Sequence, residues 1–278
     1  MRTFVIQSKT AWSGHSIPAQ SYGYTAIEAI EYQNWRQREK VYDYVLNNDM
    51  GFTSHGKAGA PEAIEYDYLS KNHIPVGSAE YTLAWLSLMG CGEVRPLNIP
   101  KEMRSYLSRE CVTTSELSGY TGEWMVKDAI VIKSDSNGFM KLPREVHGNY
   151  FMTQWIDDVI SEWRLFVFNK EIVGMRCYSG NEWVTPDKAY CERVVSSYSK
   201  KTYTLDVMVY PNRNKPMESN IHNDWMHRLL ITDIVEVHDF FACGLYGFED
   251  YKNLPRMWSA AIDDLLGRGE KGVPQLCR

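Results

Sequence analysis

Two apolar segments in the second half of the chain contain ionisable residues whose spacing could bind a metal ion. Asp206 interrupts the segment TYTLDVMV, and Glu236 and His238 interrupt DIVEVHDF. Residues i and i+2 of a strand project to the same face, so Glu236 and His238 point together. If the strand with Asp206 lies beside theirs, the three side chains converge. The two carboxylates would then form a hard-oxygen site suited to Mg²⁺ held jointly with nucleotide phosphates.

The same three residues also fit a structural interpretation. They could be buried, hydrogen-bonded polar groups or one polar face of a sheet, and taken in pairs they favour that interpretation. Taken together with the basic residues of the same region they favour chemistry, because acids for a cation and cations for phosphates are the components of an ATP–Mg²⁺ site.

Two lysines stand at the ends of strand-like segments. Lys127 ends EWMVK and Lys133 ends AIVIK, and the Ser/Asn/Gly-containing turn SDSNGF follows the second. Lysines placed beside such a turn can present ammonium groups and backbone N–H donors to phosphate oxygens. Solvated strand ends are the alternative, and the local pattern alone favours it.

An arginine lies within the apolar segment EWRLFVF. Alternation along a strand places Arg164 on the same face as large aromatic residues, where a charge needs a partner. It could pair with Glu162 or reach an anionic ligand, and the pattern leaves both open. Arg176 in the following segment is a weaker candidate. The two predicted faces are Glu162, Arg164, Phe166 and Phe168 on one side and Trp163, Leu165 and Val167 on the other.

Several classes of protein are disfavoured by the sequence. The P-loop and G-x-G-x-x-G patterns are absent, as are G-x-S-x-G and the kinase motif pair. A net charge of −5 argues against nucleic acid as the main partner. The six cysteines are scattered without a C-x-x-C pair, which predicts free thiols in a reducing cytoplasm. No apolar run is long enough for a signal peptide or a membrane span, so we expect a cytoplasmic protein.

The first third of the chain mixes helix and strand patterns. A strand is predicted over 3–7, a helix over 26–47, a weak helix after a Gly-rich break at 51–61, and a strand entering a helix over 73–90. Ser78 is the expected N-cap of that helix. The segment 95–103, with two prolines, is the expected linker.

Beyond about residue 105 the pattern changes to short strands. Asn169-Lys170 is a tight-hairpin signal that lacks the preferred glycine. Mostly antiparallel strands with flanking helices predict an α+β domain after a smaller α/β portion. The predicted strands are 123–127, 129–133, 162–168, 171–179, 202–210 and 233–241, and a last helix covers 254–266 with Gly267 as its stop.

The order of these segments resembles the ATP-grasp superfamily, and most closely its small phage- and bacteria-associated members. The resemblance covers about residues 100–265, with IPVGSAEY at 74–81 similar to the region that precedes the domain. It implies two α+β subdomains that grip ATP, in residues 99–278, after a small α/β domain in residues 1–98. The motifs that carry it are MVK (125–127), IK (132–133), GF (138–139), EWR (162–164), TLDV (204–207) and VEVHDFFACGLYGF (235–248).

The resemblance implies a role for individual residues. Lys127 and Lys133 would contact nucleotide phosphates. Arg164 would lie near the transferred phosphate, with Lys133 and Arg176 as further catalytic residues. The segment QWIDD (154–158) would supply the adenine hinge through Gln154 and Ile156 and the ribose-binding acid through Asp157 or Asp158. The implied metal ligands are Asp206, Glu236 and His238, with Mg²⁺ or Mn²⁺ as the ion.

Two positions depart from the family pattern. His238 stands where the family has an asparagine at the metal. It could bind a softer divalent ion, contact the substrate or only pack, and we expect a peripheral role. Asp128 follows the lysine where a proline is usual, which we expect to change only the strand exit.

The activity that the resemblance implies is a carboxylate–amine ligase. ATP would phosphorylate a carboxylate, and an amine would displace phosphate to form an amide or peptide-type bond, with ADP and phosphate released. The expected substrates are a small-molecule or peptide carboxylate and an amine. The alternatives are a kinase-like phosphotransferase on the same fold and a nucleotide-binding protein without turnover.

Overall fold

The computed structural model describes residues 2–7, 19–47, 72–132, 137–213 and 229–267. Contacts divide the chain into two units, one formed by Met1–Val94 with Asp239–Arg278 and the other by Arg95–His238. The expected boundary between the α/β domain and the ATP-grasp domain, between residues 98 and 99, stays a prediction. None of the helices in the described part of the chain combines the length and apolar character needed to span a bilayer.

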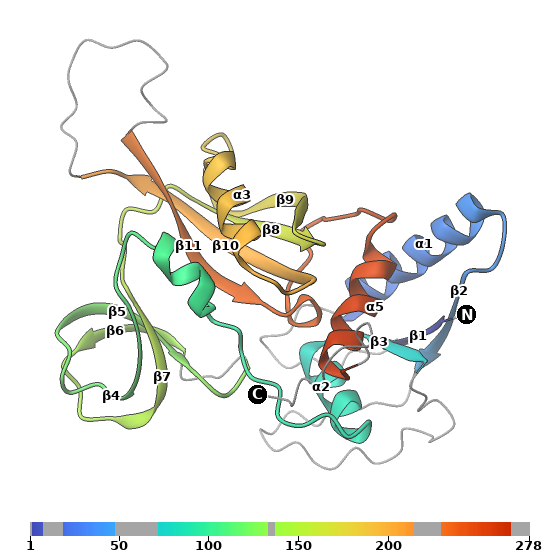
Figure 1. Cartoon of the computed structure of the whole chain (residues 1–278), viewed down its shortest axis with the longest axis horizontal. Coiled ribbons are helices and arrows are strands. Elements are labelled where there is room, and N and C mark those ends of the chain that lie inside the picture. Colours follow the sequence, from blue (N-terminus) through green and yellow to red (C-terminus); the bar gives the residue numbers. More distant parts are fainter. Residues whose placement is uncertain (1, 8–18, 48–71, 133–136, 214–228, 268–278) are drawn as a thin grey trace, which may run out of the picture. The chain divides into compact units, whose positions relative to one another are not determined.

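The first unit contains a three-stranded parallel sheet in the order β2-β1-β3 (Figure 1). The predicted N-cap is confirmed, because Ser78 accepts a hydrogen bond from the backbone N–H of Tyr81 at 3.1 Å. Gly77 lies so close to Gln7 that a Cβ would approach its side chain to 2.6 Å. The elements are β1 (Arg2–Gln7), α1 (Ala19–Gln37), β2 (Tyr42–Asn47), β3 (His73–Val76), α2 (Ala79–Leu88), the short 3₁₀ helix η4 (Phe240–Ala242) and α5 (Leu254–Leu265).

The helix predicted over 26–47 is wrong in its last part. Helix α1 ends at Gln37, Arg38 adopts a positive φ of 57°, and the following residues form β2. The Asn34 side chain fixes this turn, because it accepts hydrogen bonds from the N–H groups of Val41 and Tyr42 at 3.0 Å. The break at 51–61 and most of the weak helix expected after it lie outside the described residues.

The second unit contains two antiparallel sheets, and the first has the order β4-β7-β5-β6 (Figure 1). Its core includes Leu117, Trp124, Val126 and Met152. The strands are β4 (Cys111–Glu116), β5 (Gly122–Asp128), β6 (Gly138–Leu142) and β7 (His147–Gln154).

The strand predicted over 129–133 is wrong for its described residues. After β5 the chain turns, because the Asp128 carboxylate accepts hydrogen bonds from the N–H groups of Ile130 and Val131 at 2.8 and 2.9 Å. An aspartate that bonds to the backbone two residues on is a turn-forming device, and it overrides the β-branched composition of the segment.

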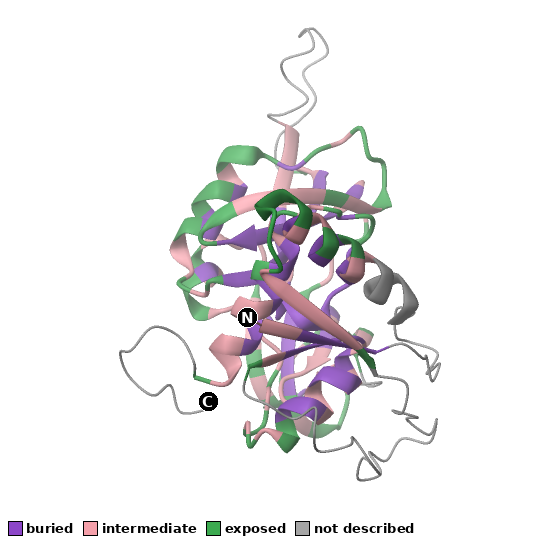
Figure 2. Ribbon diagram, turned by 90° about the vertical axis from the view of Figure 1, so that its right-hand side faces the viewer, coloured by how far each residue is buried: buried purple, intermediate pink, exposed green. Residues whose placement is uncertain are grey.

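The second sheet has the order β11-β10-β8-β9, and its strands carry many of the buried residues (Figure 2). The prediction that Trp163, Leu165 and Val167 share one face of β8 is confirmed. All three pack in one hydrophobic cluster with residues of α3 and β10. The strand predicted over 233–241 ends at His238. The elements are the 3₁₀ helix η2 (Lys101–Tyr106), β8 (Ser161–Phe168), β9 (Glu171–Gly180), α3 (Lys188–Ser197), β10 (Thr202–Pro211) and β11 (Leu230–His238).

The predicted hairpin between β8 and β9 turns at Asn169 and Lys170, which have φ values of 52° and 66°. Lys170 therefore holds a conformation that glycine adopts at lower cost. We expect Lys170→Gly to raise the free energy of unfolding by about 0.5–1 kcal/mol. Urea denaturation measures the change, and Lys170→Ala, which keeps the strained backbone, should leave it unchanged. Equal effects of the two variants would contradict the explanation.

Candidate functional site

A cavity of about 420 Å³ lies within the second unit. Its walls come from both sheets and from the segment that follows β7. Lys127 enters it from β5, Glu162 from β8, Tyr178 from β9 and Glu236 from β11. The cavity therefore gathers charged residues that lie more than 100 positions apart in the sequence.

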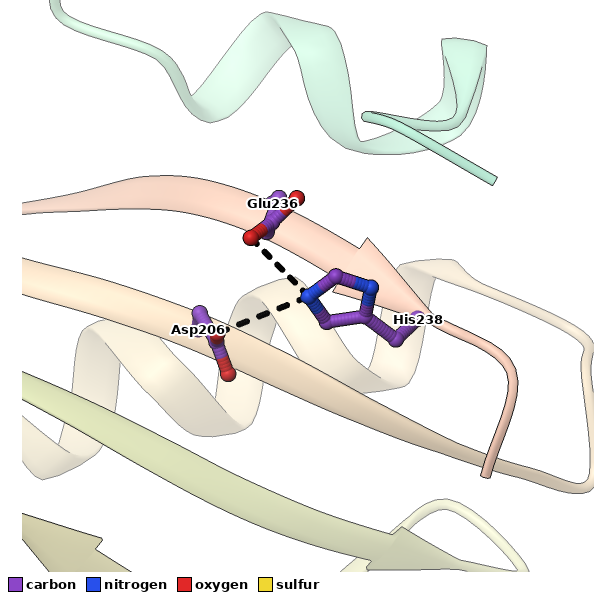
Figure 3. A group of neighbouring side chains, drawn as sticks. All are labelled: Asp206, Glu236 and His238. Atoms are coloured by element: carbon purple, nitrogen blue, oxygen red, sulfur yellow. Dashed lines mark ion pairs between the residues drawn. The ribbon is translucent and has the colours of Figure 1, made fainter. Parts of the chain in front are cut away.

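Asp206, Glu236 and His238 converge at one end of the second sheet, as the sequence predicts (Figure 3). One ligand atom of each lies within 4.8 Å of the others. The His238 imidazole points toward both acids, with Nε2 at 2.9 Å from Glu236 Oε1 and 3.7 Å from Asp206 Oδ2. Asp206 is buried, whereas the other two are half-buried.

Strand register explains why these side chains meet. Asp206 of β10 is the direct partner of Glu236 on β11 and of Arg164 on β8, so the three form one row across the sheet. Directly opposite residues share a face of the sheet. The register shifts between Asp206 and Val207, so the irregularity lies at the row itself. Bulges of this kind often redirect a side chain beside a functional site.

Arg164 finds its partner in Asp206 rather than in Glu162. Its Nε lies 2.8 Å from Oδ1 and its Nη2 lies 2.6 Å from Oδ2 of the aspartate. Both side chains are almost fully buried, with exposed fractions of 6% and 2%. The guanidinium also lies over the ring of Tyr178, at 5.7 Å from its centroid. The sequence left open whether Arg164 pairs with an acid or reaches an anionic ligand. In the structure it forms an ion pair with Asp206, one of the three predicted metal ligands.

Lys127 forms an ion pair with Glu236 Oε2. Burial raises the pKa of Glu236, but the charges and hydrogen bonds of His238 and Lys127 outweigh it and hold the pKa well below its usual range. Glu236 is therefore a carboxylate anion at neutral pH, which is the form that binds cations.

Glu162 and Tyr178 join this cluster, and neither was predicted as a site residue. Burial, followed by the charges of Asp206 and Glu236, raises the pKa of Glu162. Burial and the same nearby acids also raise the pKa of Tyr178, so its hydroxyl stays protonated and donates a hydrogen bond to Glu162. Strand alternation in β8 placed Glu162 on the same face as Arg164. This was the sequence pattern that could have identified Glu162 as a site residue.

Arg109 is a second residue that sequence reasoning missed. It lines the cavity and donates to the carbonyl of Gln154 at 3.0 Å and to that of Ile234 at 2.7 Å. Its Nε lies 3.7 Å from the fully buried carboxylate of Asp233. Burial raises the pKa of Asp233, although Arg109 and Ser108 oppose the shift. Arg109 thus connects the end of β7 with β11, and no local pattern marks it.

The segment 154–158 contributes to the cavity wall between the sheets. Ile156 and Asp157 line the cavity. The Gln154 side chain is exposed at the end of β7. Its backbone N–H donates to the carbonyl of Glu110, just before β4, and its carbonyl accepts from Arg109. Arg213 binds both predicted ribose acids, with contacts of 2.5 Å to Asp157 and 3.0 Å to Asp158. The choice between the two acids stays open.

Of two other predicted residues, one lies outside the described part of the chain and the other is not brought to the cluster. Lys133 lies outside the described residues. Arg176 is opposite Arg164 on β9, but it is exposed, donates to the carbonyl of Met175 at 3.0 Å and is not part of the cavity wall. The expected catalytic roles of both stay predictions.

The donor set of the cluster fits a divalent cation. Two carboxylates offer the oxygen ligands that Mg²⁺ prefers, and an imidazole adds a nitrogen that suits Mn²⁺ better. In the structure the oxygens of Asp206 and Glu236 instead contact Arg164, Lys127 and His238. Binding an ion here requires at least one of these contacts to be exchanged.

Residues 130–254 match the family model of the ATP-grasp domain, R2K clade family 2. This segment includes β6 to β11 and with them the whole Arg164–Asp206–Glu236 row. The match confirms the predicted ATP-grasp domain over this segment, and the α+β sheets described above have the ATP-grasp fold. The sequence has no match among the curated proteins.

Several solved structures are similar to this chain. A RimK domain protein ATP-grasp from Sphaerobacter thermophilus DSM 20745 has 12% identity and a TM-score of 0.44, over 96% of this chain and 99% of that one. The macrocyclase MdnC of Microcystis aeruginosa MRC, bound with precursor peptide MdnA, has 11% identity and a TM-score of 0.42, over 96% and 100%. D-Alanine–D-alanine ligase from Bacillus anthracis, complexed with ATP, has 12% identity and a TM-score of 0.39, over 97% and 99%.

The Arg164–Asp206 pair gives a test of the site's architecture. Arg164→Met leaves a buried carboxylate without its partner, so we expect it to lower the free energy of unfolding by about 3–5 kcal/mol. The double variant Arg164→Met/Asp206→Asn should lose less than this single variant, because no buried charge is left unpaired. Urea denaturation gives these values. The exposed Arg176→Met is the control and should change stability by less than about 0.5 kcal/mol. Additive losses in the double variant would contradict the buried pair.

Proposed function

We propose that this protein is an ATP-dependent carboxylate–amine ligase that works through an acyl-phosphate intermediate. One observation supports it above all others: inside a segment that matches the ATP-grasp domain, the row Arg164–Asp206–Glu236 ends at a carboxylate that lines a cavity together with Lys127. A site that transfers phosphate needs acids for a divalent ion and cations for phosphate oxygens at the same place. The cavity wall carries both.

In this proposal the nucleotide lies along the cavity. Lys127 takes phosphate oxygens, and Lys133 adds a second ammonium group. Ile156 and the backbone after Gln154 face the adenine, and Asp157 or Asp158 accepts a hydrogen bond from the ribose. Arg164, held by Asp206, presents positive charge where the transferred phosphate gains negative charge. Arg176 is assigned to the acceptor side, because it lies on the exposed end of the same row.

Asp206, Glu236 and His238 would hold Mg²⁺ or Mn²⁺, which would neutralise charge on the phosphates of ATP. The chain's own contribution is positioning: fixed dipoles and charges stabilise the transition state without having to reorganise. The cavity walls also limit access of water, which would hydrolyse an acyl phosphate.

The chemistry proceeds in two steps. A carboxylate oxygen of the substrate attacks the γ-phosphorus of ATP, the bond to the β-phosphate oxygen breaks, and ADP leaves. An amine then attacks the carbonyl carbon of the acyl phosphate, phosphate leaves, and the proton of the amine passes to solvent. A small amino acid, a peptide or a modified side chain can supply the carboxylate. In this proposal residues 99–278 form the catalytic domain of a cytoplasmic enzyme.

The activity is tested with ATP, Mg²⁺ and a panel of amino acids and dipeptides. We expect ADP and phosphate to be released together, in proportion to an amide product found by mass spectrometry. Hydroxylamine should replace the amine and give a hydroxamate, because it captures acyl phosphates. Formation of AMP would contradict the acyl-phosphate route. A stable phosphorylated product without amine dependence would assign a phosphotransferase, and absence of ATP binding in calorimetry would assign a protein without this activity.

The acids of the row should be essential for turnover. We expect Glu236→Gln to lower ATP turnover by roughly a hundredfold, because it removes a charged oxygen from the point where phosphate charge must be neutralised. A chelator should abolish turnover of the wild type, and Mg²⁺ or Mn²⁺ should restore it. Glu171→Gln, an exposed acid at the β8–β9 hairpin, is the matched control. Full activity of Glu236→Gln would contradict the proposed metal role.

A further inference from the structure

The two acids of the row have all their oxygens in contact with positively charged or donor groups of the chain itself. Both oxygens of Asp206 receive hydrogen bonds from Arg164. Glu236 uses Oε2 for Lys127 and Oε1 for His238. The charges of Asp206 and Glu236 are matched by those of Arg164 and Lys127. An approaching divalent ion therefore meets a pair of carboxylates that is already neutralised.

The two cationic partners differ in how firmly they are held. Arg164 is fixed, because it forms two hydrogen bonds to a neighbouring strand of its own sheet and only 6% of its side chain is exposed. Lys127 belongs to β5 in the other sheet, reaches across with a flexible side chain and lines the cavity. Lysine has a single compact charge on four rotatable carbons, whereas arginine holds a carboxylate in a rigid fork. Lys127 is thus the partner that can leave.

We propose that Lys127 holds the place of the divalent cation on Glu236, and that it gives up this carboxylate only when nucleotide phosphates take its ammonium group. The inference rests on the proposed function in treating Asp206, Glu236 and His238 as the metal site. It adds that nucleotide and metal binding are coupled through one lysine. By linkage, each ligand then raises the affinity for the other by the same factor.

The exchange has a simple electrostatic basis. An ammonium group and a divalent ion cannot both occupy Glu236 Oε2, so they compete for it. A triphosphate offers the ammonium group several anionic oxygens within the same cavity. When Lys127 moves to them, its ammonium group no longer neutralises the negative charge of Glu236. The carboxylate can then attract a divalent cation. The resident lysine thus suppresses metal binding when no nucleotide is bound.

The inference predicts that removing the ammonium group of Lys127 strengthens metal binding. We expect Lys127→Met to bind Mn²⁺ without nucleotide about tenfold more tightly than the wild type, measured by electron paramagnetic resonance or calorimetry. A non-hydrolysable ATP analogue should raise the Mn²⁺ affinity of the wild type by about the same factor and that of Lys127→Met much less. These measurements require no turnover.

Three variants control the result. Lys127→Arg keeps a charge at the position and should keep nucleotide-free Mn²⁺ binding weak, which separates charge from a change in folding. Lys141→Met removes an exposed lysine of β6 outside the cavity wall and should behave as wild type. Lys127→Met/Glu236→Gln should lose the gained affinity, which assigns it to this carboxylate.

The outcomes separate the two proposals. If the wild type binds Mn²⁺ with the ATP analogue, but Lys127→Met binds Mn²⁺ no more tightly than the wild type without it, the exchange is overturned and the proposed function stands. The exchange is also overturned, with the proposed function intact, if the wild type binds Mn²⁺ equally well with and without the analogue. If the wild type binds no Mn²⁺ even with the analogue, the metal site of the proposed function fails and the exchange fails with it.

Discussion

A buried arginine–aspartate pair sets the conditions for the rest of this site. Taking two charges out of water costs several kcal/mol for each ion, and the attraction between them offsets this cost only when the geometry is good. Arg164 and Asp206 meet the requirement with two short hydrogen bonds between adjacent strands. The pair fixes the register of β8 and β10, because a shift of β8 by one residue would move Arg164 to the apolar face and leave Asp206 without its partner. Glu236 is then placed by the same register, through its pairing with Asp206.

The second constraint is the connection between the two sheets of the second unit. Lys127 can contact Glu236 only if β5 is held near β11. Arg109 makes this connection, since it bonds to one carbonyl at the end of β7 and to another on β11, with Asp233 buried beside it. The carbonyls are those of Gln154 and Ile234, and each residue is followed directly by a residue of the cavity wall. The geometry of the cavity thus depends on a residue that is remote from the acids in sequence.

The sequence predicted those parts of the fold and site that depend on local periodicity. Alternation placed Arg164 with Glu162 on one face of its strand and Glu236 with His238 on one face of theirs, and the ordered motifs indicated the ATP-grasp domain that the family model matches over residues 130–254. It failed where a single side chain overrode composition, as Asn34 did at the end of α1 and Asp128 after β5. It also missed Arg109, because that role exists only through two distant carbonyl groups. The partner of Arg164 required strand order, which one sequence does not specify.

The departure at His238 changes the kind of ligand atom that the cluster offers. In the structure Nε2 lies 2.9 Å from Glu236 Oε1, so this nitrogen donates a hydrogen to the carboxylate. To serve as a metal ligand through the same atom, the imidazole must be neutral and carry its hydrogen on Nδ1. The asparagine that the family pattern implies would offer its amide oxygen without such a change. In the proposed exchange, a metal ion bound through Nε2 would therefore require His238 to give up its contact with Glu236 as well as Lys127 to leave it.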